Sequence, residues 1–475
     1  MGATLERGDA TPASEALAAE DAAFPATPAV IAGPWPSPRV AYYTLGILML
    51  AFAVSFIDRT LLSLVVGPVQ HSLSLSDTEI GLLQGLAFTI LYSIAGFPLG
   101  RLADHRSRRG IIAAGIVAWS IFTAASGFAR NYFQILVMRV GVGIGEASLS
   151  PAAVSMIADS FPPAQRSRAM GFYSCGVVLG AGLAYIVGGS AIAYITAHAH
   201  EFSLGIFEGF EPWRLAFIAI GIPGILFALL LLTVPEPARR GRGTTTAPTL
   251  KQSLLAIRGN WRTMTACTVG YGLLNIPFNG IIAWAPSYLH RVHHLGMGDV
   301  GLLLGTVFLI AGGSGQYLGG VFSDWQFSKG RKDATFRTGI LVALLAAPCA
   351  VIATTSSDLT VNMIMIALSI FFICVAIGHA PSVVSLVCPN EVRGQTYAFY
   401  LLGLQMIGHS LGPLLIGLIT DFVFGDQAKV GASMAIVGGA AAIASAGVLF
   451  IGLPHLRKSI GAQEASHAAG PRENA

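Results

Sequence analysis

Long apolar segments recur along almost the whole chain, and they constrain its fold more than any other feature. Of the 475 residues, 54% are hydrophobic and only 11% are charged, whereas about 25% of the residues of an average soluble domain are charged. A membrane-spanning helix needs about 20 mainly apolar residues. Segments that meet this requirement lie at 41–67, 78–101, 110–128, 131–157, 166–190, 213–234, 262–288, 297–322, 336–355, 360–386, 394–422 and 430–454. We therefore predict an all-α integral membrane protein with twelve transmembrane helices.

Several other classes of protein are excluded by what the chain lacks. A transmembrane β-barrel would show alternating segments of about 10 residues, and the apolar runs here are unbroken. The five cysteines lie in or near apolar segments without a CxxC pair, so we expect no disulfide framework, metal site or other cofactor. The motif GHSLG at 408–412 matches a hydrolase nucleophile elbow, but it falls inside a predicted span rather than a strand-turn-helix. We expect neither enzymatic activity nor a nucleic-acid partner.

Lys and Arg predict the orientation of the chain, because they concentrate in cytosolic loops. If the N-terminus is cytosolic, only four of the 28 basic residues face outward, namely Arg130, Arg214, Arg291 and Lys429. We therefore expect a multi-pass protein of the cell inner (plasma) membrane with both termini in the cytosol. Nothing in the sequence indicates oligomerisation, so we expect a monomer whose partners are the lipid bilayer, a small-molecule or lipid substrate, and protons.

The twelve predicted spans form two related sets of six. The loop GRLADHRSRRG follows the second span, and the similar loop GGVFSDWQFSKGRKDA follows the eighth. A second pair of similar motifs, RSRAMGFY (166–173) and RGQTYAFY (393–400), is separated by nearly the same number of residues. Many secondary transporters are built from such repeats, with the binding site between them. The predicted parts are a disordered tail (1–40), a six-helix bundle (41–234), a basic linker (235–260), a second bundle (261–454) and a C-terminal tail (455–475).

Four ionisable residues lie inside the first and fourth predicted spans: Asp58, Arg59, Arg139 and Glu146. Charges within a membrane span are costly and face a bundle interior or a water-filled cavity. Residues 139 and 146 are almost two turns apart on one helical stripe. From their depths we expect Asp58 to pair with Arg139 in one state, while Arg59 and Glu146 face the same cavity. The glycines at 141, 143 and 145 should let another helix approach closely, and the first span is our candidate.

These four groups suit proton-coupled transport. A carboxylate in a cavity of low dielectric responds to burial and to a nearby arginine, and opening the cavity changes both effects. We expect Glu146 or Asp58 to carry the proton, and the arginines to bind an anionic headgroup, since an arginine stays charged. The sequence does not decide which carboxylate takes the proton. The alternative is a fixed buried salt-bridge network that only sets the packing of the helices.

The second set of spans carries fewer charges but several polar and aromatic candidates for substrate contact. Asn275 and Asn279 flank Pro277 in the seventh span, where we expect an interrupted helix that lines a cavity. A histidine inside a span is as often a packing residue as a cavity residue. The remaining candidates in this half are Tyr271, His379, Gln405 and, without a firm assignment, His409.

Two motifs resemble those of known families. GRLADHRSRRG is similar to the signature loop of the major facilitator superfamily, usually written GxLaDrxGrkxxl, although His105 and Ser107 depart from that pattern. FIDRTLLSLV in the first span with RVGVGIGEASLSP in the fourth resembles the spinster family. The resemblance implies a fold of two pseudo-symmetric six-helix bundles. It also implies a secondary transporter for sphingolipid or lysolipid species, such as sphingosine-1-phosphate.

By the same resemblance, the signature loop should act as a gate. Asp104 resembles the family aspartate that caps the start of the eleventh helix, which carries a positive end. Arg108 or Arg109 should reach Asp159 at the cytosolic end of the fourth span, and breaking these contacts should let the cytosolic side open. The predicted gating residues are Gly100, Asp104, Arg108, Arg109, Asp159 and Asp324.

Three functions remain open at this point. The first is transport of an anionic amphiphile driven by protons. The second is transport of a small organic anion or a hydrophobic drug by the same fold. The third is a sensor that binds lipid without transporting it.

Overall fold

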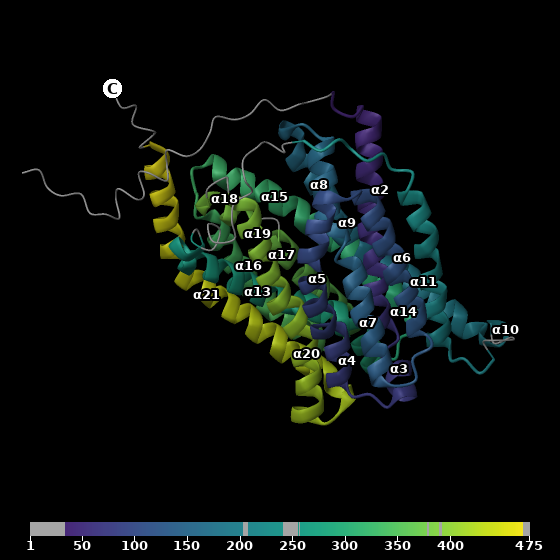
Figure 1. The fold of residues 1–475 in the computed structure, drawn as a ribbon. Helices are drawn as coiled ribbons and strands as arrows, with labels where there is room; N and C mark the ends of the chain where they lie inside the picture. Colours follow the sequence, from purple (N-terminus) through teal and green to yellow (C-terminus); the bar gives the residue numbers. More distant parts are fainter. Residues whose placement is uncertain are drawn as a thin grey trace, which may run out of the picture.

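The structure is a computed structural model that describes residues 34–202, 208–240, 255, 257–377, 380–388 and 392–468. These residues form a bundle of long helices, twelve of which are long and apolar enough to cross a membrane (Figure 1). The predicted fold class is confirmed. The predicted tail residues 1–33, most of the linker (241–254 and 256) and residues 469–475 lie outside the described residues.

Six of the spanning helices make up the first half of the protein. They are α2 (Pro38–Leu64), α4 (Asp77–Gln84) with α5 (Leu86–His105), α6 (Arg108–Ser126), α7 (Tyr132–Glu146) with α8 (Leu149–Ser160), α9 (Pro163–Ala197) and α11 (Pro212–Leu231). Short helices α3 (Val66–Leu73) and α10 (Ala199–Phe202) lie between them. Local sequence sets several of the starts: Ser76, Ser107 and Asn131 each accept a main-chain N–H at the beginning of a helix, as N-cap residues do.

The second half contains the other six. They are α13 (Trp261–His293), α14 (Met297–Val307) with η2 (Phe308–Gly312) and α15 (Gly313–Ser328), α16 (Ala334–Thr355), α17 (Leu359–Ile377) followed by α18 (Ala380–Val387), α19 (Arg393–Leu404) with η3 (Gln405–His409), α20 (Ser410–Leu418) and η4 (Ile419–Phe424), and, after η5 (Gln427–Lys429), α21 (Val430–Ala468). The segments η2, η3 and η4 are π-helical turns. Such turns are rare and occur often at functional sites.

Two local predictions differ from the structure. We expected an interruption at Pro277, but α13 is one helix from Trp261 to His293 and runs through both Pro277 and Pro286. Membrane helices tolerate proline because neighbouring helices and local adjustments satisfy the freed backbone groups. The last helix continues past residue 454 into the expected tail. Leu456 and Ile460 are buried there, and Arg457 pairs with Asp333 at 2.7 Å, so this end packs against the second half.

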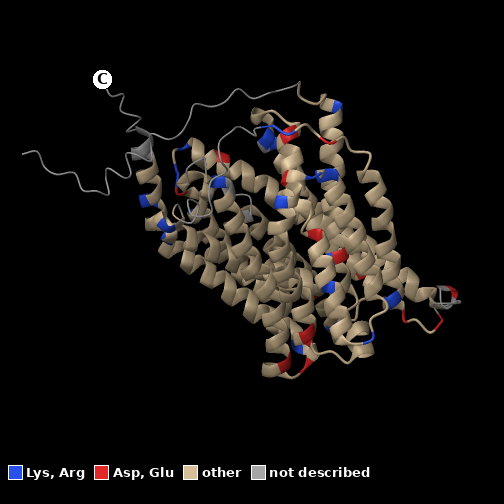
Figure 2. Ribbon diagram, viewed as in Figure 1, with Lys and Arg blue, Asp and Glu red and all other residues tan. Residues whose placement is uncertain are grey.

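The two ends of the bundle differ. One end, which we call the terminal end, holds the start of α2 and the end of α21, while α4, α20 and η4 reach the opposite, distal end (Figure 1). Lys and Arg residues gather at the terminal end, and a cluster of acidic residues lies at the distal end around α4 and η4 (Figure 2). The distribution matches what the positive-inside tendency produces in a membrane protein.

Helices from the two halves cross closely near the distal end because glycines lie at the crossings. A Cβ atom at Gly417 of α20 would lie 2.4 Å from the main-chain oxygen of Asp77. On the other side of the bundle, a Cβ at Gly301 of α14 would lie 2.3 Å from the main-chain oxygen of Tyr185 in α9 and 2.9 Å from Cα of Gly189. Small residues permit this close approach of helices in membranes, and here they join the two halves.

The crossing at Gly301 yields a first prediction. Gly301→Ala should lower the thermal stability of the purified protein, because the new methyl group has backbone atoms as its neighbours and overpacking costs about 1–3 kcal/mol. Gly46→Ala in α2 is the matched control, since a Cβ there has nothing within 4 Å. Thermal unfolding of both variants in detergent measures the difference. Equal melting temperatures for Gly301→Ala and the wild type would show that the crossing is not tight.

Candidate functional site

The four charged residues inside the first and fourth spans come together between α2 and α7. Asp58, Arg139 and Glu146 are each at most 2% exposed, although they lie within apolar helices. Arg59 donates from Nε to Oε2 of Glu146 at 2.5 Å. The expectation that Arg59 and Glu146 share one site therefore agrees with the geometry, and the two form a buried ion pair.

The expected ion pair between Asp58 and Arg139 is absent from the described residues in this state. Arg139 instead donates from Nη1 to the main-chain oxygen of Asp58 at 3.1 Å. Adjacent residues 58 and 59 point about 100° apart on a helix, and Arg59 takes the position facing Glu146. Within the described part of the chain, Oδ1 of Asp58, Nε of Arg139 and Oε1 of Glu146 are buried without a hydrogen-bond partner. The site therefore holds two buried carboxylate oxygens and one buried guanidinium N–H that could bind a polar ligand.

The three glycines of α7 also have different neighbours from those we expected. Gly141 lies against the ring of Phe122 and Gly145 against the backbone of Trp119, both in α6, and Gly143 lies against Phe88 in α5. The close approach is thus made by the second and third spans, not by the first. This arrangement leaves the stripe that carries Arg139 and Glu146 free to face α2.

Aromatic rings surround the guanidinium of Arg59. Its Cζ lies 4.7 Å from the ring centroid of Phe88, 5.2 Å from that of Tyr92 and 5.2 Å from that of Phe56. An arginine over an aromatic face gains cation–π energy, more so where it is desolvated. Phe88 and Tyr92 were missed from the sequence because an aromatic residue in an apolar span is usually a packing or lipid contact. Only their spacing of one helical turn could have marked them.

The second half contributes a polar group that contacts this aromatic wall. His409 at the end of η3 lies 5.8 Å from Phe88, ring to ring, and its Nδ1 lies 2.7 Å from Oδ1 of Asn279. Asn279 in turn donates from Nδ2 to Oδ1 of Asn275 at 2.8 Å. The amide oxygen of Asn279 can only accept a hydrogen bond, so Nδ1 of His409 is the donor. The residues Asn275 and Asn279 therefore join the site through His409, which the sequence left unassigned.

The other substrate-contact candidates are placed differently. Tyr271 is 3% exposed and donates to the main-chain oxygen of Thr335 at 2.8 Å, so its hydroxyl is used in the packing of α13 against α16. Gln405 begins η3 and is partly exposed. His379 lies outside the described residues.

The signature loop forms a brace at the terminal end of the first half. Arg108 is fully buried and pairs with Asp159, as expected. It also donates from Nε to Glu236 at 2.8 Å and from Nη2 to the main-chain oxygen of Pro237 at 2.5 Å. Arg109 donates to the main-chain oxygens of Leu232 and Val234 instead.

The contacts of the brace do not link the two six-helix bundles. These partners of Arg108 and Arg109 lie in the first half or at the start of the linker, so the contacts tie the loop to α8 and to the segment after α11. Breaking them would not by itself separate the halves. Asp104 lies exposed in the last turn of α5, Gly100 lies one turn earlier against Pro151, and Asp324 lies exposed in α15.

Glu236 acts as a cap for α6. Its carboxylate accepts the main-chain N–H groups of Arg108 and Arg109 and the hydroxyl of Ser107 at 3.0–3.2 Å. Partial burial alone would raise the pKa of this carboxyl, but the hydrogen bonds from the Arg108 side chain and from these N–H groups outweigh it, so the pKa lies below its ordinary value. A carboxyl with a lowered folded-state pKa stabilises the fold above its unfolded pKa and loses that contribution as the pH falls.

We therefore predict that Glu236→Gln destabilises the protein at neutral pH by about 1 kcal/mol, a modest value because solvent screens this carboxylate. The difference between wild type and variant should shrink as the pH falls below 4.5, the ordinary pKa of a glutamate. Thermal unfolding in detergent across that pH range measures it. A difference that stays constant with pH would contradict the assignment of Glu236 as a charged cap.

The chain is similar to several known transport proteins. Residues 48–413 match the family described as the Major Facilitator Superfamily. The chain is 28% identical over 403 residues to an MFS-type efflux pump of Mycolicibacterium smegmatis, covering 82% of this chain and 86% of the relative. It is 28% identical over 401 residues to a probable L-galactonate transporter of Escherichia coli, covering 80% and 83%.

Among solved structures, the chain resembles the crystal structure of a bacterial homolog to the human lysosomal transporter Spinster in an inward-facing and unoccupied conformation. The TM-score is 0.72 at 27% identity, and the match covers 90% of this chain and 98% of that one. The twelve apolar helices agree with the family that matches most of the length of the chain. The chain belongs to the Major Facilitator Superfamily of membrane transporters and, within it, is similar to spinster proteins.

Proposed function

We propose that the protein is a proton-coupled secondary transporter that moves an anionic amphiphile by alternating access. One observation carries the proposal: the guanidinium of Arg59 is shared between the carboxylate of Glu146 and the rings of Phe88 and Tyr92. An arginine suits the oxygens of a phosphate or carboxylate headgroup. The aromatic wall beside it suits the adjoining apolar part of the same molecule.

Glu146 and an anionic substrate would compete for Arg59. While Glu146 is ionised, it occupies Nε of the arginine at 2.5 Å. Protonation removes that negative charge and leaves the arginine without its buried partner, a state that costs several kcal/mol unless another anion replaces it. Proton and anion would therefore bind together, and the substrate would move in the same direction as the proton. Asp58 is the second candidate for the proton.

A small polyhydroxylated acid is the second candidate substrate. The hydrogen-bonded set Asn275, Asn279 and His409 faces the aromatic wall from the second half, and such side chains suit hydroxyl groups. The similarity to a probable L-galactonate transporter points to the same class. A lysolipid phosphate has a single polar end, whereas a sugar acid would use both polar sides of the site.

The gathering of Lys and Arg at the terminal end supports an orientation with that end in the cytosol. The inner (plasma) membrane is the proposed location. In that orientation the crossings at the distal end close the outer side of the transporter. The related crystal structure was solved in an inward-facing conformation, in which the outer side is likewise the closed one.

The experiment that tests the function is a flux assay in proteoliposomes with an imposed pH gradient. The panel compares a lysolipid phosphate with L-galactonate. We expect accumulation of the lysolipid phosphate in the direction of the proton gradient, and its loss when the gradient is collapsed. Accumulation of L-galactonate alone would select the second candidate. Flux of neither compound that depends on the gradient would refute both.

Single substitutions then locate the coupled proton. Glu146→Gln should keep exchange of substrate but lose gradient-driven accumulation by at least about tenfold, because the competition for Arg59 no longer depends on pH. Asp58→Asn is the matched comparison, because Asp58 makes no side-chain ion pair with the arginines among the described residues. Full pH-driven accumulation in Glu146→Gln with loss in Asp58→Asn would transfer the role to Asp58.

A further inference from the structure

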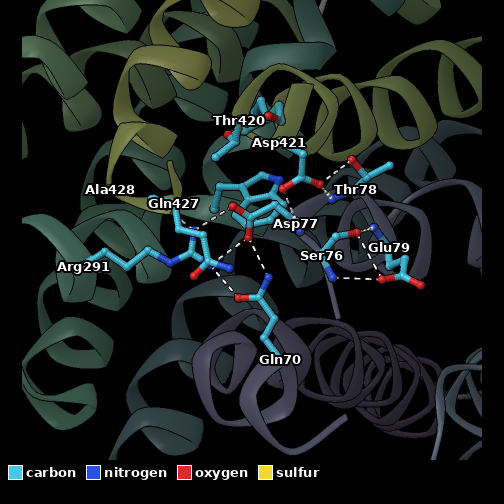
Figure 3. Close-up of polar contacts among 12 residues, drawn as sticks. Gln70, Ser76, Asp77, Thr78, Glu79, Arg291, Thr420, Asp421, Gln427 and Ala428 are labelled. Carbon is cyan, nitrogen blue, oxygen red and sulfur yellow. Dashed lines mark hydrogen bonds and ion pairs between the residues drawn. The ribbon is translucent and has the colours of Figure 1, made fainter. Parts of the chain in front are cut away.

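The distal end carries a polar contact between the two halves that no part of the proposed transport site uses. Gln70 of α3 and Asp77 and Thr78 at the start of α4 belong to the first half (Figure 3). They meet Arg291 near the end of α13 and Asp421 in η4, which belong to the second half (Figure 3). These residues are far apart in the sequence and no motif connects them.

Arg291 forms the first part of the contact. It donates from Nη2 to Oδ1 of Asp77 at 2.8 Å and from Nη1 to Oδ2 at 3.0 Å, which is a bidentate ion pair. It also donates to Oε1 of Gln70 at 2.6 Å, while Nε2 of Gln70 donates to Oδ1 of Asp77 at 2.7 Å. The three side chains therefore close a ring across the boundary between the halves, and the Asp77 side chain is fully buried within it.

Asp421 forms the second part by capping a helix of the opposite half. Its Oδ1 accepts the main-chain N–H of Asp77 at 3.2 Å, and its Oδ2 accepts the N–H and the hydroxyl of Thr78, each at 2.6 Å. The first N–H groups of a helix have no partner inside the helix, and the positive end of the helix favours a negative charge. An acidic side chain of the second half thus satisfies two main-chain donors and one hydroxyl of the first.

The remaining donors at this helix start are satisfied within the first half. Ser76 accepts the N–H of Glu79 at 3.2 Å, and Glu79 accepts the N–H of Ser76 at 2.8 Å, which together form a capping box. If the halves separate here, the capping box stays with α4 because both of its members move with it. Only the bonds to Asp421 and Arg291 are lost, so the helix start can survive opening.

Gly417 makes the reach of Asp421 possible. It precedes Asp421 by about one turn, and a side chain at this position would collide with the main-chain oxygen of Asp77, which a Cβ would approach to 2.4 Å. The π-helical segment η4 begins between the two residues. The glycine brings the backbone of the eleventh span against α4, and Asp421 then lies over the first N–H groups of that helix.

We propose that Arg291 and Asp421 form a two-part lock that stabilises the closed distal end, in which Asp421 acts as a helix cap supplied by the opposite half. The lock rests on the alternating access of the proposed function, since it has a role only if the distal end also opens. It predicts that each residue sets the population of the open state without contacting substrate. Opening exposes the ion pair and the two N–H groups to water, which replaces the lost bonds and makes the step reversible.

The test measures the distance across the distal end by pulsed electron spin resonance in lipid nanodiscs. Spin labels are attached at His71→Cys and Lys429→Cys, which are exposed in the two halves, with the exposed Cys175 replaced by alanine. We expect Asp421→Ala to increase the population with the longer distance by roughly 2- to 30-fold, as for loss of a helix cap. Arg291→Gln should increase it further because it leaves Asp77 without its cation.

Glu79→Gln is the matched control, because Glu79 caps the same helix start from within the first half. It should leave the distance distribution unchanged. Asp421→Asn provides a milder change that keeps one acceptor, and it should give a smaller shift than Asp421→Ala. An unchanged distribution in Asp421→Ala, Asp421→Asn and Arg291→Gln would overturn the lock. So would an equal shift in Glu79→Gln, since the effect would then arise from the helix start alone.

The same labels separate this proposal from the proposed function. A pH gradient or added substrate should change the distance in the wild type if alternating access holds. A wild type that responds while the lock variants match it would refute the lock and keep the transport proposal. Lock variants that open while the wild type never responds to substrate or pH would support the lock and count against the transport proposal.

Discussion

The ion pair between Arg59 and Glu146 is the interaction on which the arrangement of the first half depends. A charge in a membrane span is tolerated only where it meets a partner or water, so α2 and α7 must be oriented to bring these two side chains together at 2.5 Å. That orientation turns the glycines of α7 toward α5 and α6, where Gly145 meets the backbone of Trp119. The cost of burying the charges thereby fixes which helices pack closely.

The polar contacts divide the molecule into two stiff halves with a specific junction. Around Arg108 the brace bonds to residues of the first half and of the start of the linker. At the distal end, by contrast, Arg291 and Asp421 bond across the boundary, and the glycine crossings at Gly301 and Gly417 lie between halves as well. A bundle whose halves are joined by polar contacts and close glycine crossings near the distal end is suited to rocking of one half against the other, as in many transporters with repeated folds.

Hydropathy was sufficient to predict the twelve spans, and the cost of buried charge placed Arg59 and Glu146 in one cavity, though not as an ion pair. The sequence left open whether Arg108 or Arg109 contacts Asp159, and the structure selects Arg108. The sequence was not sufficient for the rotation of each helix about its axis. In a membrane the faces toward lipid and toward other helices are both apolar, so nothing in the pattern placed Gly143 against Phe88 or gave Arg139 the main-chain oxygen of Asp58. The cap by Asp421 has no local signal, since its partners are more than 340 residues away in the sequence.

The lock and the site share the same two spans, which has a mechanical consequence. The second span carries Thr78 at the lock and Phe88 at the site, and the eleventh carries Asp421 at the lock and His409 at the site. Between these two levels Gly85 lies against the main-chain oxygens of His409 and Ser410, at 2.9 and 2.8 Å from its would-be Cβ. A ligand that moves the second and eleventh spans apart at Phe88 and His409 would also alter this backbone contact, which leads to the capped helix start. Binding at the centre and opening at the distal end then involve one continuous pair of helices, with no additional coupling element required.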